Sequence, residues 1–220
     1  MGKIIVIEGL DGSGKATQTA ALRDALNAMG LDPVSLSFPD YDSPACGPVK
    51  MYLDGCFGSS ASDVDGYAAS VLYAVDRFAS YRTKWKDEYA SGRIFVADRY
   101  TTSNAVYQTG KLPVTEWDGF CDWLFEFEYV RMGIPRPDLV IYLDVDPEVC
   151  SRLMSVRYSD DESKRDIHEK DTEFQKHSRE AALYCAEHQG WKVVKCDRDG
   201  EMRPKDDISS EILSLVREII

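Results

Sequence analysis

The sequence predicts a single α/β domain built on a five-stranded parallel sheet with helices on both faces. Two observations support this. Five short apolar runs rich in β-branched residues are spaced along the chain, and each is followed by a longer segment with helical spacing. The runs lie at 4–7, 34–38, 94–97, 139–143 and 193–194. A chain of 220 residues can bury one large core, so we expect one domain over 1–220.

The first helix is predicted at 15–29, because Gly30 can close it and Pro33 then resets the chain before the second strand. A long helical pattern over 63–90 ends at Gly92. Further helices are predicted at 116–131, 147–155, 170–188 and 208–219. Strands that alternate with helices in this way are joined by right-handed crossovers. Because ligands of such sheets bind beyond the carboxyl ends of the strands, the functional residues should follow the apolar runs.

Composition narrows the class of partner. The formal net charge is −12, which argues against a nucleic-acid polymer, because such polymers need a basic surface. No signal peptide precedes the first strand and no apolar run is long enough to span a membrane, so we expect a cytoplasmic protein. The six cysteines are scattered without a CxxC pair, and this favours reduced core residues over disulfides or zinc ligands.

A glycine-rich loop follows the first strand directly. Residues 9–17 read GLDGSGKAT and match the GxxxxGK pattern of a phosphate-binding P-loop between a strand and a helix. Glycines let consecutive backbone amides turn towards phosphate oxygens, and the helix that follows points its positive end at them. The pattern predicts an ATP site in a P-loop NTPase-type fold, formed by Gly9, Leu10, Asp11, Gly12, Ser13, Gly14, Lys15, Ala16 and Thr17.

One position of the loop departs from the pattern. Ala16 stands where a Ser or Thr hydroxyl normally binds Mg²⁺, and the Thr17 hydroxyl points about 100° away around the helix. Either the metal is held through water by carboxylates such as Asp11 and Asp98, or Mg²⁺ binds more weakly than usual. We favour the first interpretation.

A second group of motifs follows the other strands. Asp98-Arg99-Tyr100 comes after the third run and leads into SNAVYQ at 103–108. FPDY follows the second run at 38–41, and YAVDR occupies 73–77 in the long helix. With EGLDG at 8–12, these motifs resemble the thymidylate kinase family over nearly the whole chain. The resemblance implies transfer of the γ-phosphoryl group of ATP to deoxythymidine monophosphate (dTMP), with Mg²⁺. It also implies a homodimer, which we expect to form through the helix at 63–90.

The resemblance also implies roles at the acceptor phosphate and sugar. Arg99 would bind the acceptor phosphate, and Asp11 would lie near the sugar 3′-hydroxyl. Tyr107 would lie under the sugar, where a ribose 2′-hydroxyl would collide with it. Phe38 and Tyr41 would form walls of the pocket. Physical chemistry supports the first of these, because a planar guanidinium suits phosphate better than an ammonium group does.

For the base, the resemblance implies that Tyr73 stacks on thymine, Arg77 bonds O4 and Asn104 bonds the N3 edge. Tyr73 and Arg77 are four residues apart, so a ring and a forked donor share one helix face. The alternative is that this pair has no role in binding: the tyrosine ring packs in the core and the arginine lies in solvent.

Phosphoryl transfer requires positive charge around the transferred group. Lys15 is the loop's own cation, so we expect a mobile lid at about 152–166 to supply more. Arg157 and Arg165 are the catalytic candidates, and Arg152 is a candidate for binding the donor nucleotide.

Three alternatives remain open. The same fold could phosphorylate another nucleoside monophosphate or a deoxynucleoside. A GTP-dependent switch would carry an NKxD motif, and we find none. Because of Ala16, the chain could also bind nucleotide but transfer phosphate poorly.

Overall fold

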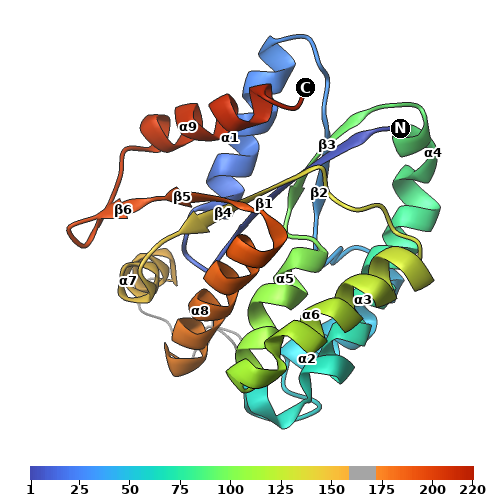
Figure 1. Ribbon diagram of the computed structural model, residues 1–220, viewed down its shortest axis with the longest axis vertical. Coiled ribbons are helices and arrows are strands. Elements are labelled where there is room, and N and C mark those ends of the chain that lie inside the picture. Colours follow the sequence, from blue (N-terminus) through green and yellow to red (C-terminus); the bar gives the residue numbers. More distant parts are fainter. Residues whose placement is uncertain (159–171) are drawn as a thin grey trace.

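A five-stranded, entirely parallel sheet forms the centre of the protein, as the sequence predicts (Figure 1). The computed structural model describes residues 1–158 and 172–220. The strand order is β2-β3-β1-β4-β5. The strands are β1 (Lys3–Gly9), β2 (Val34–Ser37), β3 (Ile94–Asp98), β4 (Leu139–Asp144) and β5 (Lys192–Lys195). The α/β fold class is therefore confirmed.

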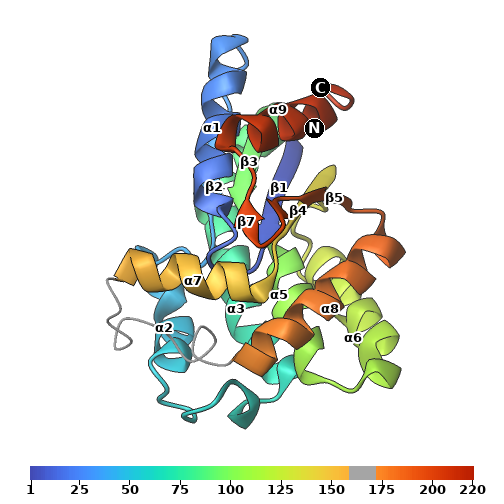
Figure 2. The same ribbon diagram turned by 90° about the vertical axis from the view of Figure 1, so that its left-hand side faces the viewer.

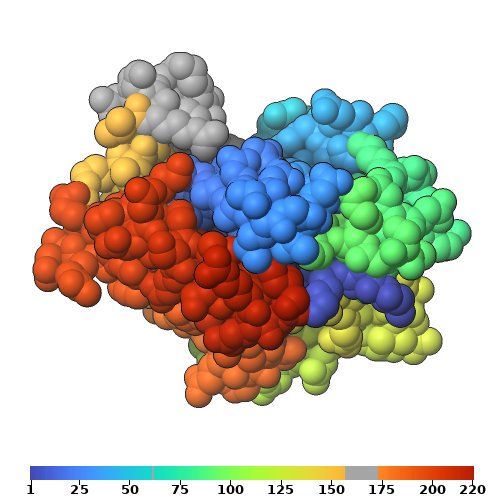
Figure 3. Space-filling view, turned by 90° about the horizontal axis from the view of Figure 1, so that it is seen from above, coloured from blue at the N-terminus to red at the C-terminus, as the bar shows by residue number. Residues whose placement is uncertain are grey.

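The middle of the sheet is buried on both faces. Ile4, Ile5, Val6 and Ile7 of β1 are each 0% exposed, and all six residues of β4 are buried. Such runs cannot alternate apolar and polar residues, because helices cover both sides of the sheet. In Figure 1, α1 and α9 lie on one face, while α5, α6 and α8 lie on the other. Figure 3 shows the C-terminal residues, in red, against the N-terminal residues in blue, in keeping with the contact between α9 and α1.

The helices follow the predicted segments closely, with two interruptions. The predicted helix at 63–90 consists of α3, a π-helical turn η3 and α4, and it begins at Gly66 because the Asp65 carboxylate caps the amides of Tyr67 and Ala68. The predicted helix at 116–131 likewise ends in a π-helical turn, η6. The bounds are α1 (Lys15–Ala28), α2 (Gly47–Leu53), α3 (Gly66–Ser80), η3 (Tyr81–Trp85), α4 (Lys86–Ala90), α5 (Thr101–Tyr107), α6 (Trp117–Phe125), η6 (Glu126–Arg131), α7 (Pro147–Tyr158), α8 (Thr172–Gln189) and α9 (Lys205–Arg217).

Several elements were not predicted from the sequence. They are the short helices α2 and α5 and a small hairpin of β6 (Asp197–Arg198) and β7 (Glu201–Met202). Short turns η1 (Pro44–Cys46), η2 (Ala61–Asp63), η4 (Thr109–Lys111) and η5 (Val114–Glu116) connect the rest. The predicted lid at 152–166 begins inside helix α7, which extends to Tyr158, and its remainder lies outside the described residues.

The cysteines are free thiols, and five of the six are buried while Cys56 is exposed. Within the described ranges, no helix is long and apolar enough to cross a bilayer. The loops after β1, β2 and β3 and helix α7 after β4 meet at the carboxyl edge of the sheet, where Figure 2 shows α7 running across the bottom of the strands.

Candidate active site

The glycine-rich loop between β1 and α1 has the backbone that phosphate binding requires. Gly12 has φ +85°, and a Cβ atom there would lie 2.6 Å from the Cys150 carbonyl oxygen of α7. Gly14 has φ +90° and begins helix α1 without a side-chain cap. The first amides of α1 therefore have no competing side-chain acceptor, and they are left for an anion.

Lys15 lies folded over this loop. It is 7% exposed, and its Nζ donates to the carbonyl oxygens of Gly9 at 2.9 Å and Leu10 at 2.8 Å. The Asp11 carboxylate lies 3.5 Å from Nζ. Burial lowers the pKa of Lys15, and the nearby Arg99 guanidinium adds to this effect. The lysine charge is thus held by carbonyl and carboxylate oxygens that a phosphate can replace.

Arg99 meets the same loop from β3. Its guanidinium forms an ion pair with Asp11 and lies with its central carbon 5.2 Å from the centroid of the Tyr107 ring. The Tyr107 hydroxyl donates to the second Asp11 oxygen at 3.0 Å. Arg99 has φ +68°, a left-handed conformation that costs a non-glycine residue about 1–2 kcal/mol. Strain of this kind persists where the surrounding structure imposes it, commonly at functional sites.

The loop and Arg99 face one cavity of about 510 Å³. It is open enough for part of a nucleotide, and its wall combines the phosphate loop with the residues after β2 and β3. The predicted site residues on its wall are Asp11, Gly12, Gly14, Lys15, Ala16, Thr17, Phe38, Tyr41, Asp98 and Arg99. Ser37, Pro39, Leu153 and Met154 complete the lining, the last two from α7.

The predicted base-binding residues are not on the wall of this cavity. Tyr73 is half-buried, with its ring 6.1 Å edge-on from Tyr52. Arg77 is 2% exposed and donates from Nε to Glu128 Oε2 at 2.7 Å. Burial by itself lowers the pKa of Arg77, but the Glu128 carboxylate more than offsets this, so the pKa is raised. Asn104 donates to the same carboxylate at 3.2 Å.

A second buried glutamate, Glu8, lies under the phosphate loop. It is 0% exposed, and the Ser103 hydroxyl donates to its Oε1 at 2.6 Å. Its Oε2 has no hydrogen-bond partner among the described residues. Burial raises the pKa of Glu8, although Arg99, Ser103 and Lys15 oppose the effect. The sequence offered one signal for it, a carboxylate directly after an apolar strand run.

Of the predicted lid cations, only Arg152 has a described side chain, and it does not line the cavity. Arg152 of α7 is half-exposed and donates to the Gly200 carbonyl of the β6–β7 hairpin, with Glu201 at 3.3 Å. Arg157 belongs to the last turn of α7, and Arg165 lies outside the described residues.

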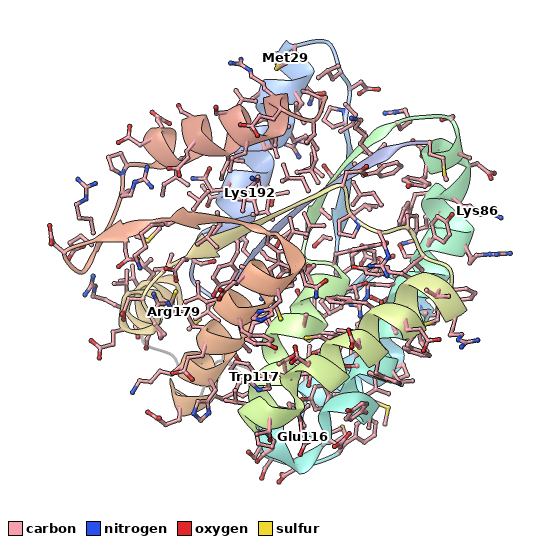
Figure 4. All side chains as sticks on the ribbon, in the orientation of Figure 1. Met29, Lys86, Glu116, Trp117, Arg179 and Lys192 are labelled. Carbon is pink, nitrogen blue, oxygen red and sulfur yellow. The ribbon has the colours of Figure 1, made fainter. Side chains whose placement is uncertain are left out.

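A basic group that the sequence analysis did not single out lies at the ends of β4 and β5. Arg179 of α8, labelled in Figure 4, donates from Nε to Asp144 at 2.6 Å, and Lys195 donates to the same carboxylate at 3.1 Å. Burial acts to raise the pKa of Asp144, but these hydrogen bonds outweigh it, and the pKa is lowered. This cluster ties α8 to the sheet edge next to α7.

Two carboxylates at the cavity, Asp11 and Asp98, could hold Mg²⁺, and Asp98 suits the ion better. Within the described ranges, no three His, Cys, Asp or Glu side chains cluster as a metal site. Asp98 lines the cavity, and its carboxylate makes no hydrogen bond or ion pair with another described residue, whereas Asp11 is already paired with Arg99 and Lys15. Mg²⁺ keeps several waters and needs only one or two carboxylates, so Asp98 fits an ion held through water.

Comparisons with known proteins agree on one family. The sequence model of the family described as "Thymidylate kinase" matches residues 7–203. A thymidylate kinase of Mycobacterium tuberculosis is 34% identical over 203 residues, covering 89% of this chain and 92% of that protein. One from Arabidopsis thaliana is 28% identical over 218 residues, covering 99% of this chain and 73% of the relative.

Among solved structures, the thymidylate kinase of Candida albicans superimposes with a TM-score of 0.70. The match covers 99% of this chain and 92% of that one at 22% identity, so it supports the fold. With the phosphate loop and the DRY segment facing a common cavity, the family match over most of the chain makes this protein a member of the thymidylate kinase family.

Proposed function

We propose that the 510 Å³ cavity is where the γ-phosphoryl group of ATP passes to dTMP. The family match gives the reaction, phosphorylation of dTMP to dTDP. One observation supports this location most strongly. The phosphate loop and Arg99, which come from different strands, line the same cavity, so one phosphate held by each would lie face to face.

The donor side consists of the loop amides and Lys15. An ATP phosphate entering the loop would take the Lys15 ammonium from the Gly9 and Leu10 carbonyls, exchanging neutral acceptors for charged ones. The loop needs no rearrangement for this, since its glycines already hold the required dihedral angles. Preorganised donors of this kind stabilise developing charge without paying for reorientation.

The acceptor side consists of Arg99, Asp11 and Tyr107. In our proposal Arg99 leaves Asp11 for the acceptor phosphate, and Asp11 is then available for the sugar 3′-hydroxyl. Tyr107, beneath the sugar, disfavours a ribonucleotide. Phe38 and Tyr41 form part of the cavity wall. Tyr73, Arg77 and Asn104 would receive the thymine.

Three finer points belong to the same proposal. Mg²⁺, bound through water by Asp98 with Asp11, would neutralise phosphate charge. Arg157 and Arg165 would approach the γ-phosphoryl group, whereas Arg152 would first have to leave Gly200 and Glu201 to bind the donor. A homodimer would use the exposed face of α3, where Val71 is 37% and Val75 43% exposed.

The test is a panel of monophosphates and thymidine assayed with ATP and Mg²⁺. We expect dTMP to be the best acceptor and thymidine to be inactive. Lys15→Ala should lower kcat by at least about 10³-fold, and Arg99→Ala should lower kcat/KM for dTMP by about 10²–10³-fold. Equal use of thymidine would favour the deoxynucleoside alternative. Tight nucleotide binding with little turnover would favour the weak-transfer alternative, and normal activity in both variants would refute the site.

A further inference from the structure

Glu128, in the π-helical turn η6, accepts hydrogen bonds from side chains of two other elements. It is 0% exposed. Arg77 of α3 donates to both of its oxygens, from Nε at 2.7 Å and from Nη2 at 2.5 Å. From α5, the Thr101 hydroxyl donates at 2.9 Å and the Asn104 amide at 3.2 Å. A buried carboxylate with four donors is fully satisfied and rigid.

This arrangement determines which way the Asn104 amide faces. Nδ2 lies 3.2 Å from Glu128 Oε1 and 3.2 Å from the Ser70 carbonyl oxygen. Both partners can only accept, so the amide nitrogen has to point at them, because the opposite orientation would place oxygen against oxygen. Both N–H groups are then used. Oδ1 accepts no hydrogen bond from any described residue, so Asn104 offers a ligand an acceptor and not a donor.

Arg77, unlike Asn104, offers a ligand hydrogen-bond donors. Of its five N–H groups, two are directed at Glu128 and one, on Nη1, at the Tyr100 carbonyl at 3.4 Å. The remaining two are donors, and a guanidinium has no acceptor. Side by side around Glu128, Arg77 and Asn104 therefore form a donor next to an acceptor.

We propose that Glu128 is the positioning residue that makes this site selective for an imide base, thymine or uracil, over cytosine. An imide edge presents a carbonyl oxygen, which accepts, beside N3–H, which donates. Cytosine presents the reverse, an amino donor beside an unprotonated N3. The inference rests on the proposed function, in which Arg77 and Asn104 meet the base, and it adds the group that fixes their polarity.

The size of the effect follows from unpaired polar groups. A site built to hydrogen-bond one pattern rejects a ligand that lacks it by about 10⁴-fold or more, because its own buried groups lose their partners. A single methyl group on the base contributes far less. Glu128 thus accounts for discrimination between base classes and leaves thymine and uracil nearly equivalent on this edge.

The test compares Glu128→Gln with Glu128→Asp, measuring kcat and KM for dTMP and dCMP at saturating ATP. Glutamine keeps the shape but replaces one accepting oxygen with a donating nitrogen, so the Asn104 amide can turn over. We expect KM for dTMP to rise at least about tenfold, KM for ATP to stay unchanged and the preference for dTMP over dCMP to narrow at least about tenfold. Aspartate still only accepts, so it should keep the preference. The matched control is Glu126→Gln, on the same turn but exposed.

An unchanged preference in Glu128→Gln would overturn the proposal, as would an equal loss of activity towards both monophosphates. If this variant does not fold, the wild-type chain gives a second readout. The side-chain amide protons of Asn104, assigned by their loss in Asn104→Asp, should exchange slowly with solvent without ligand, and fast exchange would contradict the orientation. A wild-type chain that does not use dTMP would instead refute the proposed function and leave the amide measurement unaffected.

Discussion

Two glutamates lie fully buried beneath the two halves of the site, and their surroundings differ. Glu128, on the side of the predicted base-binding residues, is reached by donors from Arg77, Thr101 and Asn104. Glu8, on the phosphate side, has one such donor, Ser103, and its second oxygen has no partner in the described part of the chain. Both are 0% exposed, so the contrast is not one of depth.

The difference matches what each half of the site would bind. A base keeps the same hydrogen-bonding pattern throughout phosphoryl transfer, so a locked network suits it. Phosphate charge moves during the reaction, and the groups near it exchange partners. Around the loop, Lys15, Asp11 and Arg99 are held mainly by one another and by backbone carbonyls. The base side is thus built for fixed recognition and the phosphate side for rearrangement.

The largest expected effect on stability comes from removing one partner of the buried Arg77–Glu128 ion pair. Arg77→Met should lower the free energy of unfolding by about 3–5 kcal/mol, because it leaves the Glu128 carboxylate buried without its main counter-charge. Urea denaturation at pH 7 measures this. The double variant Arg77→Met/Glu128→Leu should recover most of the loss, since neither charge is left unpaired. A loss below about 1 kcal/mol in the single variant would mean that the network is not energetically coupled.

Much of this architecture followed from the sequence. All five strands and the long helices are confirmed, because apolar periodicity and glycine or proline punctuation are local signals. Helix α5 was missed, since seven residues directly after a strand are too few to show a period. The lid at 152–166 stays a prediction: its first residues belong to helix α7, which extends three residues past the predicted helix end at 155, and the rest lies outside the described residues.

The residues of the candidate site also include some that the sequence predicts and one, Glu128, that it did not. The phosphate loop and the residues that share its cavity belong to contiguous motifs, and their convergence followed from sheet topology. Glu128 was overlooked because one glutamate in FEFEYVR resembles a solvated charge. A signal existed: Phe120, Leu124 and Glu128 are spaced by four, so the carboxylate continues a buried apolar stripe and needs a partner. Which partner it finds depends on long-range packing, which the sequence pattern does not specify.

A smaller effect on stability is expected at Glu8, whose Oε2 has no hydrogen-bond partner in the described part of the chain. Glu8→Gln should stabilise the protein at pH 8, because burial raises the pKa of Glu8 and the glutamine amide carries no charge to bury. The folded state holds this proton at pH values where the unfolded chain has lost it. Wild-type stability therefore falls as the pH rises from the unfolded pKa, about 4.3, through the folded pKa.

The measurement is the unfolding temperature of both proteins between pH 4 and pH 9. The unfolding temperature of Glu8→Gln should match that of the wild type near pH 4 and exceed it at higher pH, with each kcal/mol of added stability raising it by about 2–4 °C. Ser103→Ala serves as the control, because it removes the neighbouring hydroxyl and keeps the carboxyl. Parallel curves for wild type and Glu8→Gln would show that Glu8 carries no such cost and would remove the contrast with Glu128.

The smallest effect is expected at Ala16, and it tests how the phosphate side holds its metal. Ala16→Ser restores a hydroxyl at the cavity wall, at the position where related phosphate loops bind Mg²⁺ directly. If Asp98 holds the ion through water, as we propose, the Mg²⁺ concentration for half-maximal rate should change by no more than about twofold, because the new hydroxyl replaces one water ligand with a similar oxygen. Asp98→Asn should then raise that concentration at least about tenfold, since it removes the charge that attracts the ion. Thr17→Val, a neighbouring hydroxyl removed on the same helix turn, should leave it unchanged. If Ala16→Ser instead lowers the Mg²⁺ concentration for half-maximal rate tenfold, the natural chain lacks a metal ligand that the serine supplies, and Asp98 alone does not hold the ion well.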